Sequence, residues 1–219
     1  MFIFYLPLFQ PSFLPENVSL QFKCQFMLGL KLATDPRWVN IVESNIEEIL
    51  TDHAWCEQKA ASNAISIIAQ NSEYEELVTA LLALAKEELE HFQLVHDLIK
   101  ARGLTLGRER KDSYVNELFK FLTQGGTRQQ RLVDRLLFSA MIEARSCERF
   151  KLLSEKISDP ELSKFYYELM VSEAGHYTTF LAFARKFCGD VEQARKDLLA
   201  YCQLDTWAMV KILEVLKRV

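Results

Sequence analysis

Two copies of a carboxylate–imidazole pair are the residues of this chain best suited to chemistry. They are Glu88-Leu-Glu-His91 and Glu173-Ala-Gly-His176. On an α-helix a spacing of three residues stacks both side chains on one face, one turn apart. Glu57 and Glu143 precede the two motifs at nearly equal distances, 31 and 30 residues before the first glutamate of each. The chain therefore repeats a helix with one glutamate followed by a helix with a glutamate–histidine pair.

The six side chains form a set that is typical of a di-metal centre. Four glutamates in an apolar interior would repel one another, and two divalent cations would remove this cost. Ferritin-like four-helix bundles hold two iron or manganese ions with four carboxylates and two histidines. Cysteine thiolates, which favour zinc, are absent from both motifs. The predicted ligands are Glu57, Glu88, His91, Glu143, Glu173 and His176.

Neighbouring residues leave some of these assignments open. Glu87 also lies one turn from the histidine of the first motif and competes with Glu88, but the second motif has Ser172 at the matching position. Glu148 competes with Glu143, although the repeat favours Glu143. A ligating histidine usually donates its other nitrogen to a nearby group. Residues that are candidates for such supporting contacts are Asp52, His53 and His96.

Long helices are predicted to carry these residues. The 219-residue chain has only 7 glycines and 5 prolines, and its apolar residues recur at helical spacing. Asp35-Pro36 and Asp159-Pro160 mark two helix starts, and Ser72 and Thr127 open two capping-box sequences. Helices are expected at 35–70, 72–102, 127–154 and 159–187, with short helices at 113–122 and after 190. The predicted fold is all-α, a ferritin-like four-helix bundle with a crossover between its halves and extra short C-terminal helices.

The N-terminal residues 1–33 differ in composition from the rest of the chain. Their first 15 residues contain no charge, but three prolines interrupt the apolar run. The run falls short of the roughly 20 residues that a transmembrane helix needs, and no signal-peptide pattern is evident. We therefore expect an apolar extension at 1–33, a single bundle domain at 34–219, and no membrane partner. The five cysteines form no Cys-x-x-Cys pair, which favours a reducing compartment, the cytoplasm.

Several stretches resemble the MiaE family of tRNA hydroxylases over residues 30–205. They are Thr34-Asp-Pro-Arg-Trp38, Asp52-His-Ala-Trp-Cys-Glu-Gln-Lys-Ala-Ala-Ser62, Glu87-Glu-Leu-Glu-His-Phe92, Met141-Ile-Glu-Ala-Arg-Ser-Cys-Glu-Arg-Phe150 and Ser172-Glu-Ala-Gly-His-Tyr177. The resemblance implies a non-haem di-iron monooxygenase that hydroxylates the isopentenyl group of 2-methylthio-N6-isopentenyladenosine next to the anticodon of tRNA. It also implies O₂ and two electrons from an external donor, such as a ferredoxin and its reductase. The family's ligands fall on the six residues that the spacing selects, while manganese stays open because it uses the same donors.

A tRNA partner requires a basic surface, and the net charge of −4 does not show whether the chain has one. Four negative charges belong to the predicted ligands and would be neutralised by two divalent ions, so the total does not exclude nucleic acid. The alternative is an ordinary solvated charged surface. The residues expected to contact tRNA phosphates are Arg102, Arg108, Arg110, Lys111, Arg128 and Arg131.

The ligand set alone also fits other functions. A rubrerythrin-like peroxidase, a manganese catalase and an iron-storage protein are alternatives on the same fold. A rubrerythrin would usually add a rubredoxin-like cysteine cluster, which the sequence lacks. A storage protein would form a closed spherical oligomer, which gel filtration distinguishes from a particle of one or two chains.

Overall fold

Helices make up most of the structure, a computed structural model that describes residues 30, 33–109, 125–190 and 196. They are α3 (Trp38–Ser44), α4 (Ile46–Gln70), α5 (Glu75–Ala101), α7 (Arg128–Lys156) and α8 (Pro160–Cys188). No strand occurs among the described residues, so the predicted all-α fold is confirmed there. The predicted short helices at 113–122 and after 190 lie outside the described residues, apart from Lys196, and so does most of 1–33.

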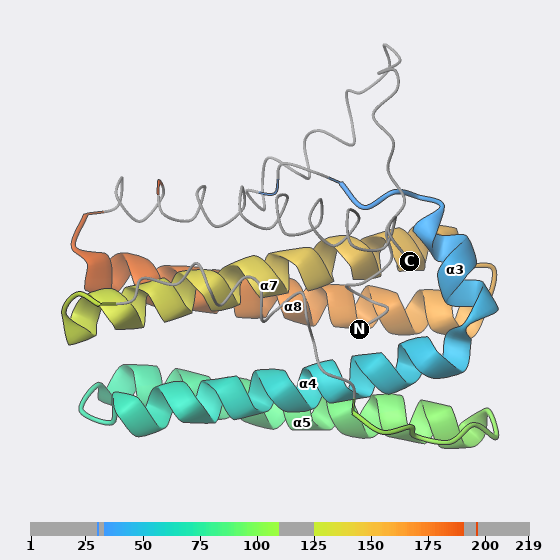
Figure 1. Cartoon of the computed structure of the whole chain (residues 1–219), viewed down its shortest axis with the longest axis horizontal. Helices are drawn as coiled ribbons and strands as arrows, with labels where there is room; N and C mark the ends of the chain where they lie inside the picture. Colours follow the sequence, from blue (N-terminus) through green and yellow to red (C-terminus); the bar gives the residue numbers. More distant parts are fainter. Residues whose placement is uncertain (1–29, 31–32, 110–124, 191–195, 197–219) are drawn as a thin grey trace, which may run out of the picture. The chain divides into compact units, whose positions relative to one another are not determined.

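The described residues fall into two compact units. One unit covers residues 41–109 and the other contains residues 33–40 and 125–190, so the border lies within α3. α4 packs on α5 in the first unit, and α7 packs on α8 in the second (Figure 1). Because only a few residues separate the two helices of each pair, the partners run antiparallel. Each unit is thus one copy of the predicted helix–turn–helix repeat, and the single domain at 34–219 stays a prediction.

Apolar side chains at three- and four-residue spacing form the interior of each pair. Burying one aliphatic side chain of this kind stabilises the fold by about 1.5–3 kcal/mol. None of the described helices has an apolar stretch long enough to cross a bilayer. The buried positions include Ile49, Leu50 and Ile67 of α4, Leu77, Leu81 and Ile99 of α5, Leu136 and Leu153 of α7, and Tyr166 and Phe180 of α8.

The predicted helix at 35–70 is wrong in one respect, because the structure divides it at Asn45. The Asn45 side-chain amide donates to the Ile41 carbonyl at 2.8 Å, and the backbone leaves helical geometry at φ −137° and ψ 39°. Short polar side chains of this type compete with the backbone for its own hydrogen bonds. The spacing of apolar residues does not reveal this break, because the helical spacing continues on both sides of Asn45.

Three of the four helix starts follow the sequence signals. Thr127 forms the predicted capping box with Gln130, and the Asp159 carboxylate accepts from two backbone N–H groups at the start of α8. Asp35 accepts from the backbone N–H of Arg37, just before α3. Ser72 is the exception, since α5 begins at Glu75 and its N-cap residue is Tyr74, which forms no side-chain cap. The predicted capping box at Ser72 is therefore wrong.

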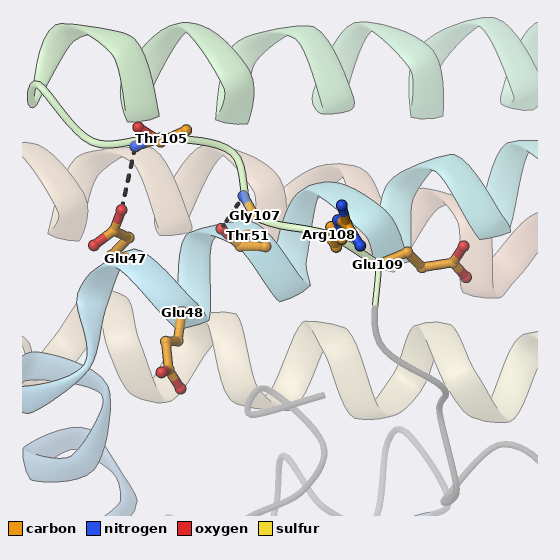
Figure 2. Close-up of a pocket in the computed structure, with 7 residues that line it drawn as sticks. All are labelled: Glu47, Glu48, Thr51, Thr105, Gly107, Arg108 and Glu109. Atoms are coloured by element: carbon orange, nitrogen blue, oxygen red, sulfur yellow. Dashed lines mark hydrogen bonds between the residues drawn. The ribbon is translucent and has the colours of Figure 1, made fainter.

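The chain after α5 forms a short strap, residues 104–109, that runs along α4 (Figure 2). Alternate strap residues meet α4 side chains that are four positions apart, so the strap follows one face of the helix. A β-carbon at Gly107 would lie 3.1 Å from Thr51 Cγ2, and a larger residue would push the strap away. The contacts are Thr105 N to Glu47 Oε1 (3.3 Å), Gly107 N to Thr51 Oγ1 (3.2 Å), Trp55 Nε1 to Gly107 O (2.9 Å) and Lys59 Nζ to Glu109 Oε1 (3.2 Å).

The cap of α8 gives a direct test of this fold. Asp159→Ala removes the acceptor for the N–H groups of Glu161 and Leu162 and should lower the free energy of unfolding by about 1 kcal/mol. Asp159→Asn keeps an acceptor oxygen and should lose much less. Urea unfolding followed by circular dichroism measures both variants, and equal losses would contradict the capping role.

Candidate metal centre

The α4–α5 pair carries the first cluster of predicted ligands. Glu57 comes from α4, and Glu88 and His91 lie one turn apart on α5, with all three buried. One ligand atom from each lies within 4.8 Å of the others. His91 Nδ1 is 3.5 Å from Glu88 Oε2 and 3.8 Å from Glu57 Oε2. The competing residue Glu87 is exposed, so burial favours Glu88.

The α7–α8 pair carries the second cluster in the same arrangement. Glu143 comes from α7, and Glu173 and His176 lie one turn apart on α8. All three are buried, and one ligand atom of each lies within 4.8 Å of the others. His176 Nδ1 is 4.0 Å from Glu173 Oε1. The internal repeat of the sequence is therefore a repeat of local geometry as well.

The chemistry of each cluster fits a divalent metal ion. Two carboxylates and one imidazole stand in an apolar interior, where a carboxylate without a compensating positive charge is strongly disfavoured. Oxygen and imidazole donors without a thiolate suit iron or manganese. The buried Glu/His clusters, on a fold built from helix pairs, thus indicate a di-metal site.

Hydrogen bonds set the protonation of the first cluster. Burial raises the pKa of Glu57, but the hydrogen bond with His53 and the contacts with His91 outweigh it, so this pKa lies well below its usual range. Burial lowers the pKa of His91, but hydrogen bonds to Glu57 and Glu88 outweigh that effect and raise the pKa to about 10. Without a bound cation His91 therefore carries a proton near neutral pH.

One candidate supporting residue, His53, lies directly against a predicted ligand. It is buried one turn before Glu57 on α4, and its Nε2 is 2.5 Å from Glu57 Oε1. The matching position before Glu143 in the second unit is Ser139, which is also buried. The glutamates of the two halves thus have different neighbours. Asp52 is buried as well, whereas His96 is half-buried and stacks on Phe92 at 6.4 Å.

Glu148, the competitor of Glu143, belongs to a different network. Its carboxylate accepts from Thr34 N at 2.9 Å and from Thr34 Oγ1 at 2.7 Å, and it pairs with Arg145 at 3.0 Å. Arg149 donates to Thr34 Oγ1 at 3.4 Å and lies 5.6 Å from the ring centre of Trp38. These residues fasten the segment before α3 to α7. They belong to the stretches that resemble the MiaE family, but the sequence did not show that they fasten this segment to α7.

The basic residues expected to contact tRNA lie in different surroundings. Arg102 is half-buried at the end of α5, and Arg110 and Lys111 lie outside the described residues. Arg108 is exposed on the strap, in a groove that Glu47, Glu48 and Glu109 also line (Figure 2). Two more are exposed in the first turn of α7, Arg128 and Arg131.

Comparison with known proteins links this arrangement to a family. The family model described as tRNA-(MS[2]IO[6]A)-hydroxylase (MiaE) matches residues 21–205. A tRNA 2-(methylsulfanyl)-N(6)-isopentenyladenosine(37) hydroxylase of Pseudomonas putida is 38% identical over 162 residues, which are 74% of this chain and 78% of that protein. The hydroxylase of the same name from Salmonella typhimurium is 35% identical over 120 residues, 55% of this chain and 43% of its own length.

A solved structure is similar over most of the chain. It is called Protein 43 with aldehyde deformylating oxygenase activity from Synechococcus. The two share 35% sequence identity and superpose with a TM-score of 0.77, over 82% of this chain and 88% of the other. The likeness therefore extends to the three-dimensional fold.

The raised pKa of His91 predicts how metal uptake depends on pH. Metal binding must displace the proton that His91 holds up to a pH of about 10. The apparent affinity of the metal-free protein for Co²⁺ should therefore rise by about tenfold per pH unit between pH 7 and 8.5. Titration by visible absorption measures it, together with the protons released. A pH-independent affinity would contradict the protonated state of His91.

Proposed function

The chain belongs to the MiaE family of tRNA hydroxylases, and we propose that it hydroxylates the isopentenyl group of 2-methylthio-N6-isopentenyladenosine next to the anticodon. The observation that carries this proposal is the family match over residues 21–205. The relative from Pseudomonas putida adds 38% identity over 78% of its own length. The enzyme is thus a tRNA-modifying hydroxylase, and a cytoplasmic location follows from its substrate.

We propose that the two buried clusters together bind two iron ions. Glu57, Glu88 and His91 would supply one half of the donors, and the second half would come from α7 and α8. Manganese fits the same donors, but oxygen insertion into a C–H bond favours iron. The bound iron would supply the activation of O₂, with two electrons from an external donor such as a ferredoxin and its reductase. One oxygen atom enters the C–H bond, and the other leaves as water with two protons.

The protein's own residues would hold these donors and keep water away. Both glutamates of the first cluster and His91 are buried, so little solvent reaches them. The bond between His53 and Glu57 holds that carboxylate in one orientation. Small apolar residues, Ala61 on α4 and Ala140 on α7, lie within about one turn of the ligand glutamates and are buried. A dry interior of this kind prevents side reactions of a reactive oxidant with water.

A second candidate function follows from the solved structure. That protein is named for aldehyde deformylating oxygenase activity, and its 35% identity to this chain is similar to that of the tRNA hydroxylases. An aldehyde would then replace the modified tRNA as substrate. The two functions differ in product, because one adds oxygen to a nucleoside and the other shortens an aldehyde.

Mass spectrometry of nucleosides tests the proposed reaction. tRNA that carries the 2-methylthio-isopentenyl modification is incubated with iron-loaded protein, O₂ and a reductant. We expect one oxygen atom to be added to that nucleoside. Glu143→Ala and Glu88→Ala should reduce the rate at least about 100-fold, since each removes a metal donor.

Glu87→Ala is the matched control, because it removes a neighbouring glutamate that is exposed. Its rate should stay close to that of the wild type. A parallel reaction with a long-chain aldehyde tests the second function. Conversion of the aldehyde without change in the nucleoside, by protein with a full complement of iron, would refute the tRNA hydroxylase and favour the alternative.

A further inference from the structure

We propose that the end of the α7–α8 pair where α7 begins and α8 ends is a tRNA-contact surface. Its basic side chains would bind phosphates, and a pair of stacked phenylalanines would contact a base. This inference rests on the proposed function, because it names where the tRNA substrate is held. The residues of this surface, the basic end, are Arg128, Arg131, Phe183, Arg185, Lys186 and Phe187.

A hydrogen bond joins the two helices at the basic end. Gln129 in the first turn of α7 donates its side-chain amide to the Phe187 carbonyl in the last turn of α8, at 2.5 Å. The first turn of α7 and the last turn of α8 therefore lie side by side, as the antiparallel pair requires (Figure 1). Charges that are more than 50 residues apart in the sequence are brought to one surface.

The charge of the α7–α8 pair is concentrated at this end. Residues 128–135 and 185–190 contain five basic and two acidic residues. At the opposite end, residues 151–156 and 159–164 contain three of each. A local excess of positive charge is the electrostatic feature that binds a phosphate backbone.

Helix stability does not explain the arginines of α7. The N-terminus of a helix carries partial positive charge and favours acidic side chains. The first turn of α7 nevertheless contains no acidic residue, and Arg128 and Arg131 lie there, both exposed. Basic residues in the last turn of α8 do match the helix dipole. Arg131 donates to the neutral carbonyl of Gly126 at 2.7 Å, so it keeps its positive charge at the helix start. The two arginines thus place positive charge where the helix dipole disfavours it, and the α8 residues extend the same surface.

An aromatic row connects the basic end with the proposed metal ligands. Phe183 and Phe187 are half-buried and stack with ring centres 6.2 Å apart and planes 19° apart. With Phe180 and His176 they occupy positions i, i+4, i+7 and i+11 of α8, which share one face. His176 and Phe187 are separated by roughly 16 Å along the helix at 1.5 Å per residue.

This row suits a nucleotide from a single-stranded RNA loop. Proteins recognise such loops by stacking unpaired bases on aromatic side chains. Phosphates held at the basic end would bring the base to Phe183 and Phe187. The isopentenyl arm would then lie on the His176 side of the stacked phenylalanines. The strap is less suited to phosphates, because three glutamates line its groove beside Arg108.

Binding of a labelled RNA tests the basic end in the full-length protein. The probe is a fluorescein-labelled anticodon stem-loop with 2-methylthio-N6-isopentenyladenosine, followed by anisotropy between about 50 and 200 mM salt. Arg185→Ala/Lys186→Ala should weaken binding about tenfold and reduce the slope of log K against log salt by about 1 to 2. The matched control, Lys156→Ala/Lys164→Ala, changes the same charge at the other end of the same helices and should bind like wild type.

Phe187→Leu tests the aromatic contact and keeps an apolar side chain. It should weaken binding on the order of tenfold with an unchanged salt slope, because stacking is not ionic. Phe165→Leu, at the other end of α8, is its control and should bind normally. Equal binding by wild type, the Arg185/Lys186 variant and its control would overturn this inference alone. No binding of the RNA by the wild type would overturn the proposed function and this inference together.

Discussion

Burial of glutamates inside helix pairs is the constraint on which the rest of this structure depends. Each unit places two carboxylates and one histidine in an apolar interior, where unpaired charge is strongly disfavoured. Such a cluster is stable only if a cation or proton compensates for it, and only if the helices are long enough to bury it. The apolar interiors of the α4–α5 and α7–α8 pairs supply that burial. The same helices therefore have to bury the carboxylates and to form the apolar core of each pair.

The two halves repeat one plan but differ beside the ligands. His53 contacts Glu57 in the first half, while Ser139 takes the corresponding position in the second. The first half also holds the proton of His91 between Glu57 and Glu88. The contact with His53 lowers the pKa of Glu57, and the second half has no imidazole at the matching position. The two predicted half-sites are therefore similar in their ligands but not in the residue one turn before each glutamate.

Residues that resemble the family outside the ligands have a structural role. Thr34, Glu148 and Arg145 form one hydrogen-bonded group, and Arg149 joins it to the ring of Trp38. Buried arginines need such partners, because an unpaired buried charge is costly. The group fastens the segment before α3 to the helix that carries Glu143. These residues thus help to fix the position of α7, which carries the predicted ligand Glu143.

The sequence by itself determined the features that depend on short spacing. These features are the glutamate–histidine motifs, the capping residues Thr127 and Asp159, and the approximate bounds of α7 and α8. They depend on contacts within a few residues, which the helical period makes readable. The family resemblance came from such local motifs as well.

The tertiary structure decided what depends on contacts between distant segments. The strap on α4 and the contact between the last turn of α8 and the first turn of α7 have no local signal, because each needs segments that meet only after folding. The break at Asn45 is local, but the apolar pattern does not reveal it. The pattern continues on both sides of Asn45, while one side-chain hydrogen bond, to the Ile41 carbonyl, interrupts the helix.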